Sequence, residues 1–170
     1  MSVSTVQEAQ EKIGKWLKEN GHQVKLIEDT NSNFHFEIDY PLGTLKRQRI
    51  IQPKEYPDLI VLLNGVAVAD EHKHKMKAMS EEERDRFYGS VKKDLMFVDN
   101  SYDMNVDNDG VVQQVQFSYE FYMDSLTKTN LFKGLLLNHR TLIYIVTVFN
   151  EKFGVPQMPV ETRPSTQTVQ

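Results

Sequence analysis

Two long apolar segments constrain the fold of this chain more than any other feature of its sequence. Residues 111–123 alternate apolar and polar side chains, and this period of two is typical of a strand with one buried face. Residues 126–153 carry apolar side chains at helical spacing and predict a long final helix. Neither segment contains a recognisable catalytic constellation, so the sequence specifies a fold more closely than an activity.

The final helix is apolar on more sides than one sheet can cover, because its apolar positions extend past the stripe of about 100° that a surface helix presents. We therefore expect this helix either to be central in the fold or to be covered by a second subunit in a homodimer. His139 interrupts its apolar surface and is predicted to make a polar contact inside an interface. The residues predicted to form the partner or dimer surface are Leu135, Leu142, Ile143, Val146 and Phe149.

Local signals predict the remaining elements. Capping boxes at Thr5 and Ser80 begin two helices, and the first of these ends at Asn20-Gly21. Helical spacing also begins at Asp70. The expected strands lie around residues 24–26, 34–40, 46–49 and 59–63, and a hairpin covers residues 102–123.

This order predicts an α+β fold in which a twisted, mostly antiparallel sheet has flanking helices, in the order α-β-β-β-β-α-β-β-α. The first and last helices are expected to cover one face of the sheet. Residues 1–154 are expected to form a single α+β domain, and residues 155–170 a disordered C-terminal tail, because the tail contains three prolines and no hydrophobic periodicity.

Two local predictions concern the middle of the sheet. The continuous apolar run Leu59 to Leu63 is typical of a central strand that is covered on both faces. Asn64-Gly65 then allows either a tight hairpin or a turn toward the following helix, because this dipeptide favours two-residue turns.

A cluster of charges is expected where two neighbouring strands pair. Antiparallel pairing would place Lys46, Arg47 and Arg49 beside Glu37 and Asp39. We interpret this cluster as cross-strand ion pairing on a solvated face, and an anion site is the alternative.

Composition excludes several classes of function. The chain has no cysteine, which removes disulfides and thiolate metal sites and fits a reducing compartment. Its net charge of −4 argues against a nucleic-acid partner, which would require a basic face. We expect no signal peptide and no membrane span, since Lys133, Asn138 and Arg140 interrupt the strongest apolar run. Cytoplasm is therefore the expected location.

Two polar clusters resemble metal sites, and neither has a complete ligand pattern. His72 and His74 are two residues apart, so on a helix their side chains point roughly 200° away from each other. The alternation of acidic residues from Asp103 to Asp109 lacks the glycine or the final glutamate of a calcium loop, and a hairpin turn is the preferred interpretation. No metal and no cofactor is therefore expected.

Several short segments, spread over most of the chain, resemble an uncharacterised archaeal family, a domain of unknown function. The order of elements also resembles the type III secretion chaperones and the bacterial YbjN-type proteins. This resemblance implies a dimeric binder of partner chains and brings no active-site residue with it. The segments that carry the family resemblance are 16–19, 34–36, 51–54, 71–72, 82–84, 122–124 and 126–128.

The sequence thus predicts a protein-interaction or chaperone-like module that binds an unknown protein or peptide partner through an apolar groove or an exposed sheet edge. The alternative is a metal-assisted hydrolase that uses His72 and His74 with nearby carboxylates. The two hypotheses differ in one geometric point, which is whether the two histidines converge with a third ligand.

Overall fold

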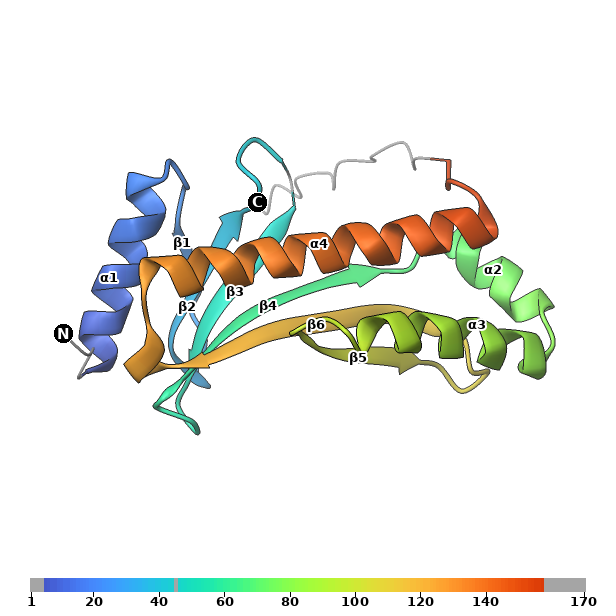
Figure 1. Ribbon diagram of the computed structural model, residues 1–170, viewed down its shortest axis with the longest axis horizontal. Coiled ribbons are helices and arrows are strands. Elements are labelled where there is room, and N and C mark those ends of the chain that lie inside the picture. The colour runs from blue at the N-terminus through green and yellow to red at the C-terminus, as the bar shows by residue number, and fades with distance from the viewer. Residues whose placement is uncertain (1–4, 45, 158–170) are drawn as a thin grey trace, which may run out of the picture.

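The computed structural model describes residues 5–44 and 46–157 (Figure 1). The observed order of elements confirms the predicted fold class, and the middle helical segment consists of two helices. The elements are α1 (Val6–Glu19), β1 (Lys25–Leu26), β2 (Ser32–Asp39), β3 (Arg47–Pro53), β4 (Leu59–Ala67), α2 (Asp70–Ala78), α3 (Glu81–Leu95), β5 (Ser101–Val106), β6 (Val112–Tyr122), the 3-10 turn η1 (Met123–Ser125) and α4 (Lys128–Phe153).

Side chains at the helix ends explain where the helices begin. The hydroxyl of Thr5 accepts a hydrogen bond from the backbone N–H of Glu8, and Thr127 does the same for Asn130. Ser80 and Glu83 form a complete capping box at the start of α3. Three of the four long helices therefore begin at local signals that the sequence contains.

The sheet has six strands in the order β1-β2-β3-β4-β6-β5, and each neighbouring pair is antiparallel. The longest pairing joins β4 to β6, from Leu59 opposite Tyr122 to Ala67 opposite Gln114. The prediction of a turn at Asn64-Gly65 is wrong, because β4 continues through both residues. Gly65 fits there because a Cβ atom would lie 3.2 Å from the backbone oxygen of Val115 on β6.

All four helices pack on one face of the sheet, which confirms the predicted place of the first and last helices. Figure 1 shows α4 lying across the strands, with α1 at one end and α2 and α3 at the other. The opposite face has no helix among the described residues, and Val61 and Leu63 are half-buried there. The prediction that β4 is covered on both faces is therefore wrong, although its interior position in the sheet is confirmed.

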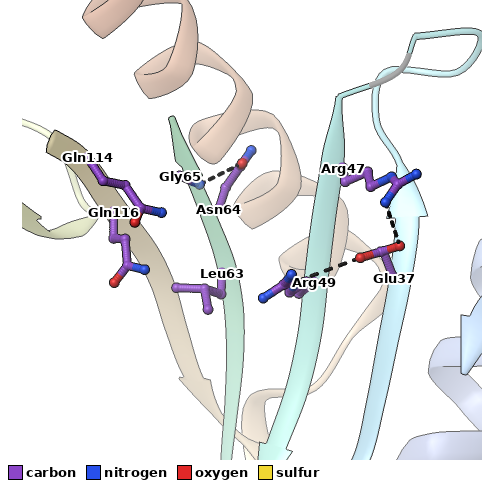
Figure 2. Close-up of a pocket in the computed structure, with 8 residues that line it drawn as sticks. All are labelled: Glu37, Arg47, Arg49, Leu63, Asn64, Gly65, Gln114 and Gln116. Carbon is purple, nitrogen blue, oxygen red and sulfur yellow. Dashed lines mark hydrogen bonds and ion pairs between the residues drawn. The ribbon is translucent and has the colours of Figure 1, made fainter. Parts of the chain in front are cut away.

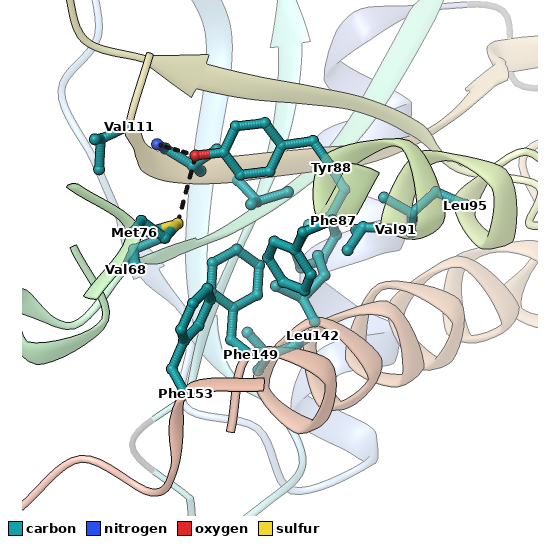
Figure 3. Close-up of a cluster of buried hydrophobic side chains, with 14 residues drawn as sticks. Val68, Met76, Phe87, Tyr88, Val91, Leu95, Val111, Leu142, Phe149 and Phe153 are labelled. Carbon is teal, nitrogen blue, oxygen red and sulfur yellow. Dashed lines mark hydrogen bonds between the residues drawn. The ribbon is translucent and has the colours of Figure 1, made fainter. Parts of the chain in front are cut away.

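Two hydrophobic clusters fill the space between the helices and the sheet. The first joins α1 and the start of α4 to β2, β3 and β4. The second joins α2, α3 and the end of α4 to β6 (Figure 3). In the second cluster Phe87 of α3 packs edge-to-face against Phe149 and Phe153 of α4, with ring centroids 5.3 and 5.1 Å apart.

A buried polar layer lies between the two clusters, where α4 crosses the middle of the sheet. Asn138 donates a hydrogen bond from Nδ2 to the carbonyl of Leu62, at 2.8 Å. Gln48 donates from Nε2 to the carbonyl of Leu135, at 2.9 Å. Asn100 in turn donates to Oδ1 of Asn138. These bonds satisfy amide N–H groups that would be costly to bury alone, although Oε1 of Gln48 has no partner, and they fix α4 against β3 and β4.

The predicted tail falls mostly outside the described residues, which end at Gln157. After Gly154 the described chain has no regular structure, and the backbone N–H of Gln157 lies 3.2 Å from both carboxylate oxygens of Glu71. None of the helices in the described part of the chain has the length and apolar character needed to span a bilayer.

Candidate functional site

The predicted partner surface on α4 divides into buried and exposed residues. Leu135, Leu142 and Phe149 are buried inside the chain, in its own two clusters, so they are not available to a partner. They are seven residues apart and therefore follow the stripe of α4 that faces the sheet and α3. Ile143 and Val146 lie on other sides of the helix and remain exposed.

An exposed apolar surface remains on the outside of α4 and in the loop after α3. We call it the α4 surface and define it as Leu136 and Ile143 of α4 with Met96 and Phe97 of the loop. Phe97 is 90% exposed, Met96 is 74% exposed and Ile143 is 43% exposed. Large side chains with this exposure are the usual mark of an interaction site when several lie on one face.

Polar contacts on both sides of the loop hold it beside α4. Tyr144 of α4 donates a hydrogen bond to the carboxylate of Asp94, at 2.7 Å. Lys133 of α4 lies 3.9 Å from the carboxylate of Asp99. Burial, and then the bond to Asp94, raise the pKa of Tyr144 above its usual range. Tyr144 therefore stays protonated and keeps the C-terminal end of α3 against α4.

Phe97 and Met96 are the residues that the sequence reasoning missed. The signal was present, because an apolar triplet, Met96-Phe97-Val98, follows the last periodic position of α3, Leu95, and precedes the hairpin. Met96 and Phe97 do not continue the helical spacing of α3, so the sequence pattern predicts no buried position for them. Large apolar residues outside any such pattern are candidates for an exposed surface.

The geometry of His72 and His74 does not form a metal site. His72 is buried, its Nε2 donates to the carbonyl of Gly154 at 2.7 Å, and its ring packs against Phe149 and Phe153. His74 is exposed, and its Nδ1 donates to the carbonyl of Asp70 at 2.7 Å. Over residues 5–44 and 46–157, no three histidine, aspartate or glutamate side chains are grouped to hold a metal ion.

The acidic segment before Gly110 forms the predicted hairpin turn. The carboxylate of Asp107 accepts hydrogen bonds from the backbone N–H groups of Asp109 and Val111, at 3.0 and 2.9 Å. Lys77 of α2 lies 2.7 Å from the carboxylate of Asp109, and this contact lowers the pKa of Asp109. The carboxylates are thus used to close the turn and to fasten it to α2.

The open face of the sheet contains the charge cluster that the sequence predicts. Arg49 lies opposite Glu37, and Arg47 lies opposite Asp39, in the register of β2 and β3. The guanidinium groups of Arg47 and Arg49 are 3.6 and 3.7 Å from the carboxylate of Glu37. The predicted cross-strand ion pairing is confirmed, while Lys46 lies before the start of β3.

A hollow of about 220 Å³ lies beside these pairs on the open face (Figure 2). Its walls contain two arginines, one carboxylate and the side-chain amides of two glutamines, so the hollow is polar. The lining residues are Glu37, Arg47, Arg49, Leu63, Asn64, Gly65, Gln114 and Gln116.

Comparison with known proteins confirms the predicted family and fold. Residues 9–149 match the family described as "Uncharacterized conserved protein (DUF2299)". The crystal structure of an uncharacterized protein from Methanothermobacter thermautotrophicus is 27% identical, with a TM-score of 0.80 over 86% of this chain and 99% of that chain. YbjN from E. coli is 11% identical, with a TM-score of 0.50 over 90% of this chain and all of its own, and this likeness concerns the fold alone. Among curated proteins, no sequence matches the chain.

Proposed function

From the premise that this chain belongs to the uncharacterized conserved family DUF2299, we propose that it is a protein-interaction module with a chaperone-like mode of binding. The polypeptide that it binds through the α4 surface is a second copy of the chain, so two copies form a homodimer. The observation that carries the proposal is the exposure of Phe97, at 90%, beside a helix whose outer side is also apolar.

The energetic argument starts from the hydrophobic effect. Each fully buried phenylalanine or isoleucine side chain gains roughly 1.5–3 kcal/mol compared with the exposed side chain. Phe97 and Met96 leave most of this gain unused in a single chain. Ile143 and Leu136, at 43% and 39% exposed, leave less than half of it unused. A partner that covers them recovers it, and interfaces obtain most of their affinity from a few such residues.

The chemistry of the surface supports a second copy as the occupant. The outer stripe of α4 carries Lys133 and Arg140 beside Leu136 and Ile143, all exposed, and Asp99 in the adjacent loop lies near Lys133 of the same chain. A twofold arrangement places the same patch on both subunits, so apolar groups face apolar groups, and the exposed Arg140 of each helix adds a cation for Asp99 of the other.

The mass of the protein in solution tests this proposal. Size-exclusion chromatography with light scattering at micromolar concentration is expected to give twice the 19.8 kDa of one chain. Phe97→Ser and Ile143→Asp each remove apolar surface from the α4 surface and are expected to return the protein to a single chain. A monodisperse wild-type monomer would contradict the homodimer.

Tyr56→Ser provides the matched control. Tyr56 is also a large exposed side chain, at 57%, and it lies in the β3–β4 connection away from α4. This change is expected to leave the mass at that of the dimer. If Tyr56→Ser and Phe97→Ser dissociated the dimer equally, loss of exposed aromatic surface in general would explain the result, and the α4 surface would not be the interface.

The hydrolase hypothesis gains no support from the positions of its two histidines. His72 contacts Gly154 and the aromatic rings of α4, so His72→Ala is expected to destabilise the fold with or without metal. A chelator is expected to leave the melting temperature of the wild type unchanged. A decrease of several degrees with chelator, absent in His74→Ala, would revive the hypothesis.

A further inference from the structure

The polar hollow on the open face exists because two neighbouring strands separate. The pairing of β3 with β4 ends where Arg49 lies opposite Leu63, whereas β4 remains paired with β6 as far as Ala67. Figure 2 shows the hollow between the diverging strands, with the arginines and Glu37 on one side and Gln114 and Gln116 on the other. Side chains from four strands therefore face one small volume.

Positive charge exceeds negative charge on one side of the hollow. Lys25, Arg47 and Arg49 surround the single carboxylate of Glu37 at distances of 4.0, 3.6 and 3.7 Å. Asp39, on the same face, adds one further negative charge. Three cations thus face two carboxylates.

The guanidinium groups also keep unused donors. Their distances to Glu37 are longer than the 2.7–2.9 Å of a charge-assisted hydrogen bond. Among the described residues neither Arg47 nor Arg49 forms a closer hydrogen bond, although each guanidinium has five N–H donors. Both side chains are more than half exposed and can turn toward a ligand.

Asn64 lies beside the hollow in β4 but does not supply a donor to it. It is opposite Phe117, whose side chain is buried in the second cluster, so the side chain of Asn64 lies on the helix-covered face of the sheet. Its Oδ1 accepts a hydrogen bond from the backbone N–H of Gly65, at 2.7 Å, and its Nδ2 is buried. The amide donors that face the hollow therefore come from β6.

The two glutamines complete the wall on the side of β6. A Cβ atom at Gly65 would lie 3.2 Å from Nε2 of Gln114 and 3.4 Å from Cγ of Gln116. The absence of a side chain at Gly65 therefore lets both glutamines lie close over β4, at the rim of the hollow. The same arrangement explains why an Asn-Gly dipeptide is found inside a strand.

We propose that this hollow binds the oxyanion of a small organic molecule, either a phosphate or a carboxylate. Arginine forks match the oxygens of both groups, and the amides of Gln114 and Gln116 donate to the remaining acceptors of the ligand. A volume of about 220 Å³ equals roughly seven water molecules in the liquid, which is enough for a head group and several further atoms. The site is independent of the α4 surface.

Isothermal titration calorimetry at fixed ionic strength tests the site, with inorganic phosphate, adenosine monophosphate and citrate as the three probes. Saturable binding of at least one probe is expected in the wild type. The double variant Arg47→Gln/Arg49→Gln is expected to bind that probe at least tenfold more weakly. A preference for the phosphate probes or for citrate decides which oxyanion the site takes. No saturation with any probe up to about 10 mM would overturn the proposal.

Two further variants separate a built site from general charge effects. Arg86→Gln removes the same charge from α3, where Arg86 pairs with Glu82 on the surface, and is expected to bind the probe like the wild type. Gln114→Glu replaces an amide donor at the rim of the hollow with a carboxylate and is expected to weaken binding at least tenfold. Equal weakening in Arg86→Gln would overturn the proposal, as would wild-type affinity in Gln114→Glu. Circular dichroism confirms that each variant is folded before it is titrated.

Discussion

Gly134 lets α4 lie directly against side chains of the sheet. A Cβ atom at this position would lie 2.4 Å from the ring of Tyr119 and 2.5 Å from Leu62, so a side chain cannot fit unless α4 or these two side chains move. We expect Gly134→Ala to lower the free energy of unfolding by about 1–3 kcal/mol, as overpacking does. Gly89→Ala is the matched control, because Gly89 is in α3 and a Cβ atom there meets no atom within 4 Å.

The control substitution Gly89→Ala is expected to change the stability in the opposite direction from Gly134→Ala. Alanine has the higher helix propensity, so Gly89→Ala is expected to raise the free energy of unfolding by up to about 1 kcal/mol. Urea titration of the two variants measures both values. Equal stabilisation by both substitutions would contradict the close packing of α4 on β4 and β6.

The two faces of β6 allow a second test at single residues. Phe117 is buried in the second cluster, whereas its neighbour Gln116 is exposed on the open face. We expect Phe117→Ala to cost about 3–5 kcal/mol of stability and Gln116→Ala less than about 0.5 kcal/mol. Denaturant titration of both variants checks the register, since a slip by one residue would reverse the two costs.

Hydrophobic periodicity predicted the face of Phe117 but not the positions of the polar residues of the core. Asn64 was assigned to a turn, because Asn-Gly is the strongest local signal for one. Its actual place depends on the pairing of β4 with β6, fifty residues further along the chain. Gln48 and Asn138 are buried for the same reason, since their partners are distant backbone carbonyls. Of the candidate anion site, the sequence therefore predicted the ion pairs between β2 and β3 but not the residues that β4 and β6 contribute.

At the scale of elements, α4 also contacts the connection between β2 and β3 through His139. Its ring lies 6.2 Å from that of Tyr40, and its Nδ1 is buried without a hydrogen-bond partner. Burial, and then the charge of Lys46, lower the pKa of His139 from the ordinary 6.5. The folded protein thus disfavours the protonated ring more strongly than the unfolded chain does.

The sign of the pH effect follows from this shift. Because the pKa is lower in the folded state, the contribution of His139 to stability is fully present above pH 6.5 and decreases as the pH falls below it. We expect His139→Gln, which cannot titrate in this range, to lose less stability than the wild type between about pH 7.5 and about pH 5.5. Urea titrations at the two pH values measure the difference. If the wild type and His139→Gln lost the same stability between the two pH values, His139 would be protonated without cost in the folded protein.

The sequence predicted the existence of helices and strands more reliably than which elements pack against each other. Helix caps and hydrophobic periodicity depend on nearby residues, whereas packing depends on residues that are distant in the sequence. The starts of α1 and α3 follow from Thr5 and Ser80. The length of β4 does not follow from its own residues, since the strand is extended by its pairing with β6. The apolar width of α4 was recognised, but α3 covers much of it, and the place of α3 beside α4 depends on contacts such as Tyr144 with Asp94.

At the scale of the whole molecule, the same three elements run through both hydrophobic clusters. Leu62 of β4, Phe121 of β6 and Leu135 of α4 belong to the first cluster. Phe117 of β6 and Phe149 of α4 belong to the second, and Val66 of β4 packs against it. The polar layer at Asn138 separates the clusters without interrupting any of these elements. The architecture of the described residues therefore predicts one cooperative unit. The single domain expected over residues 1–154 stays a prediction, which the unfolding experiment below tests.

Two leucines, one in each cluster, test whether the molecule unfolds as one unit. Leu17 of α1 and Leu95 of α3 are both fully or almost fully buried. We expect Leu17→Ala and Leu95→Ala each to lower the free energy of unfolding by about 2–5 kcal/mol in one shared transition.

Two spectroscopic signals follow the unfolding. Trp16, which packs against the first cluster, reports on that cluster by fluorescence, and circular dichroism reports on all helices. In Leu95→Ala the two signals are expected to change at the same urea concentration, because a defect in the second cluster weakens the elements common to both. If circular dichroism changed first while Trp16 remained native, the second cluster would unfold independently, and the chain would contain two folding units joined by α4.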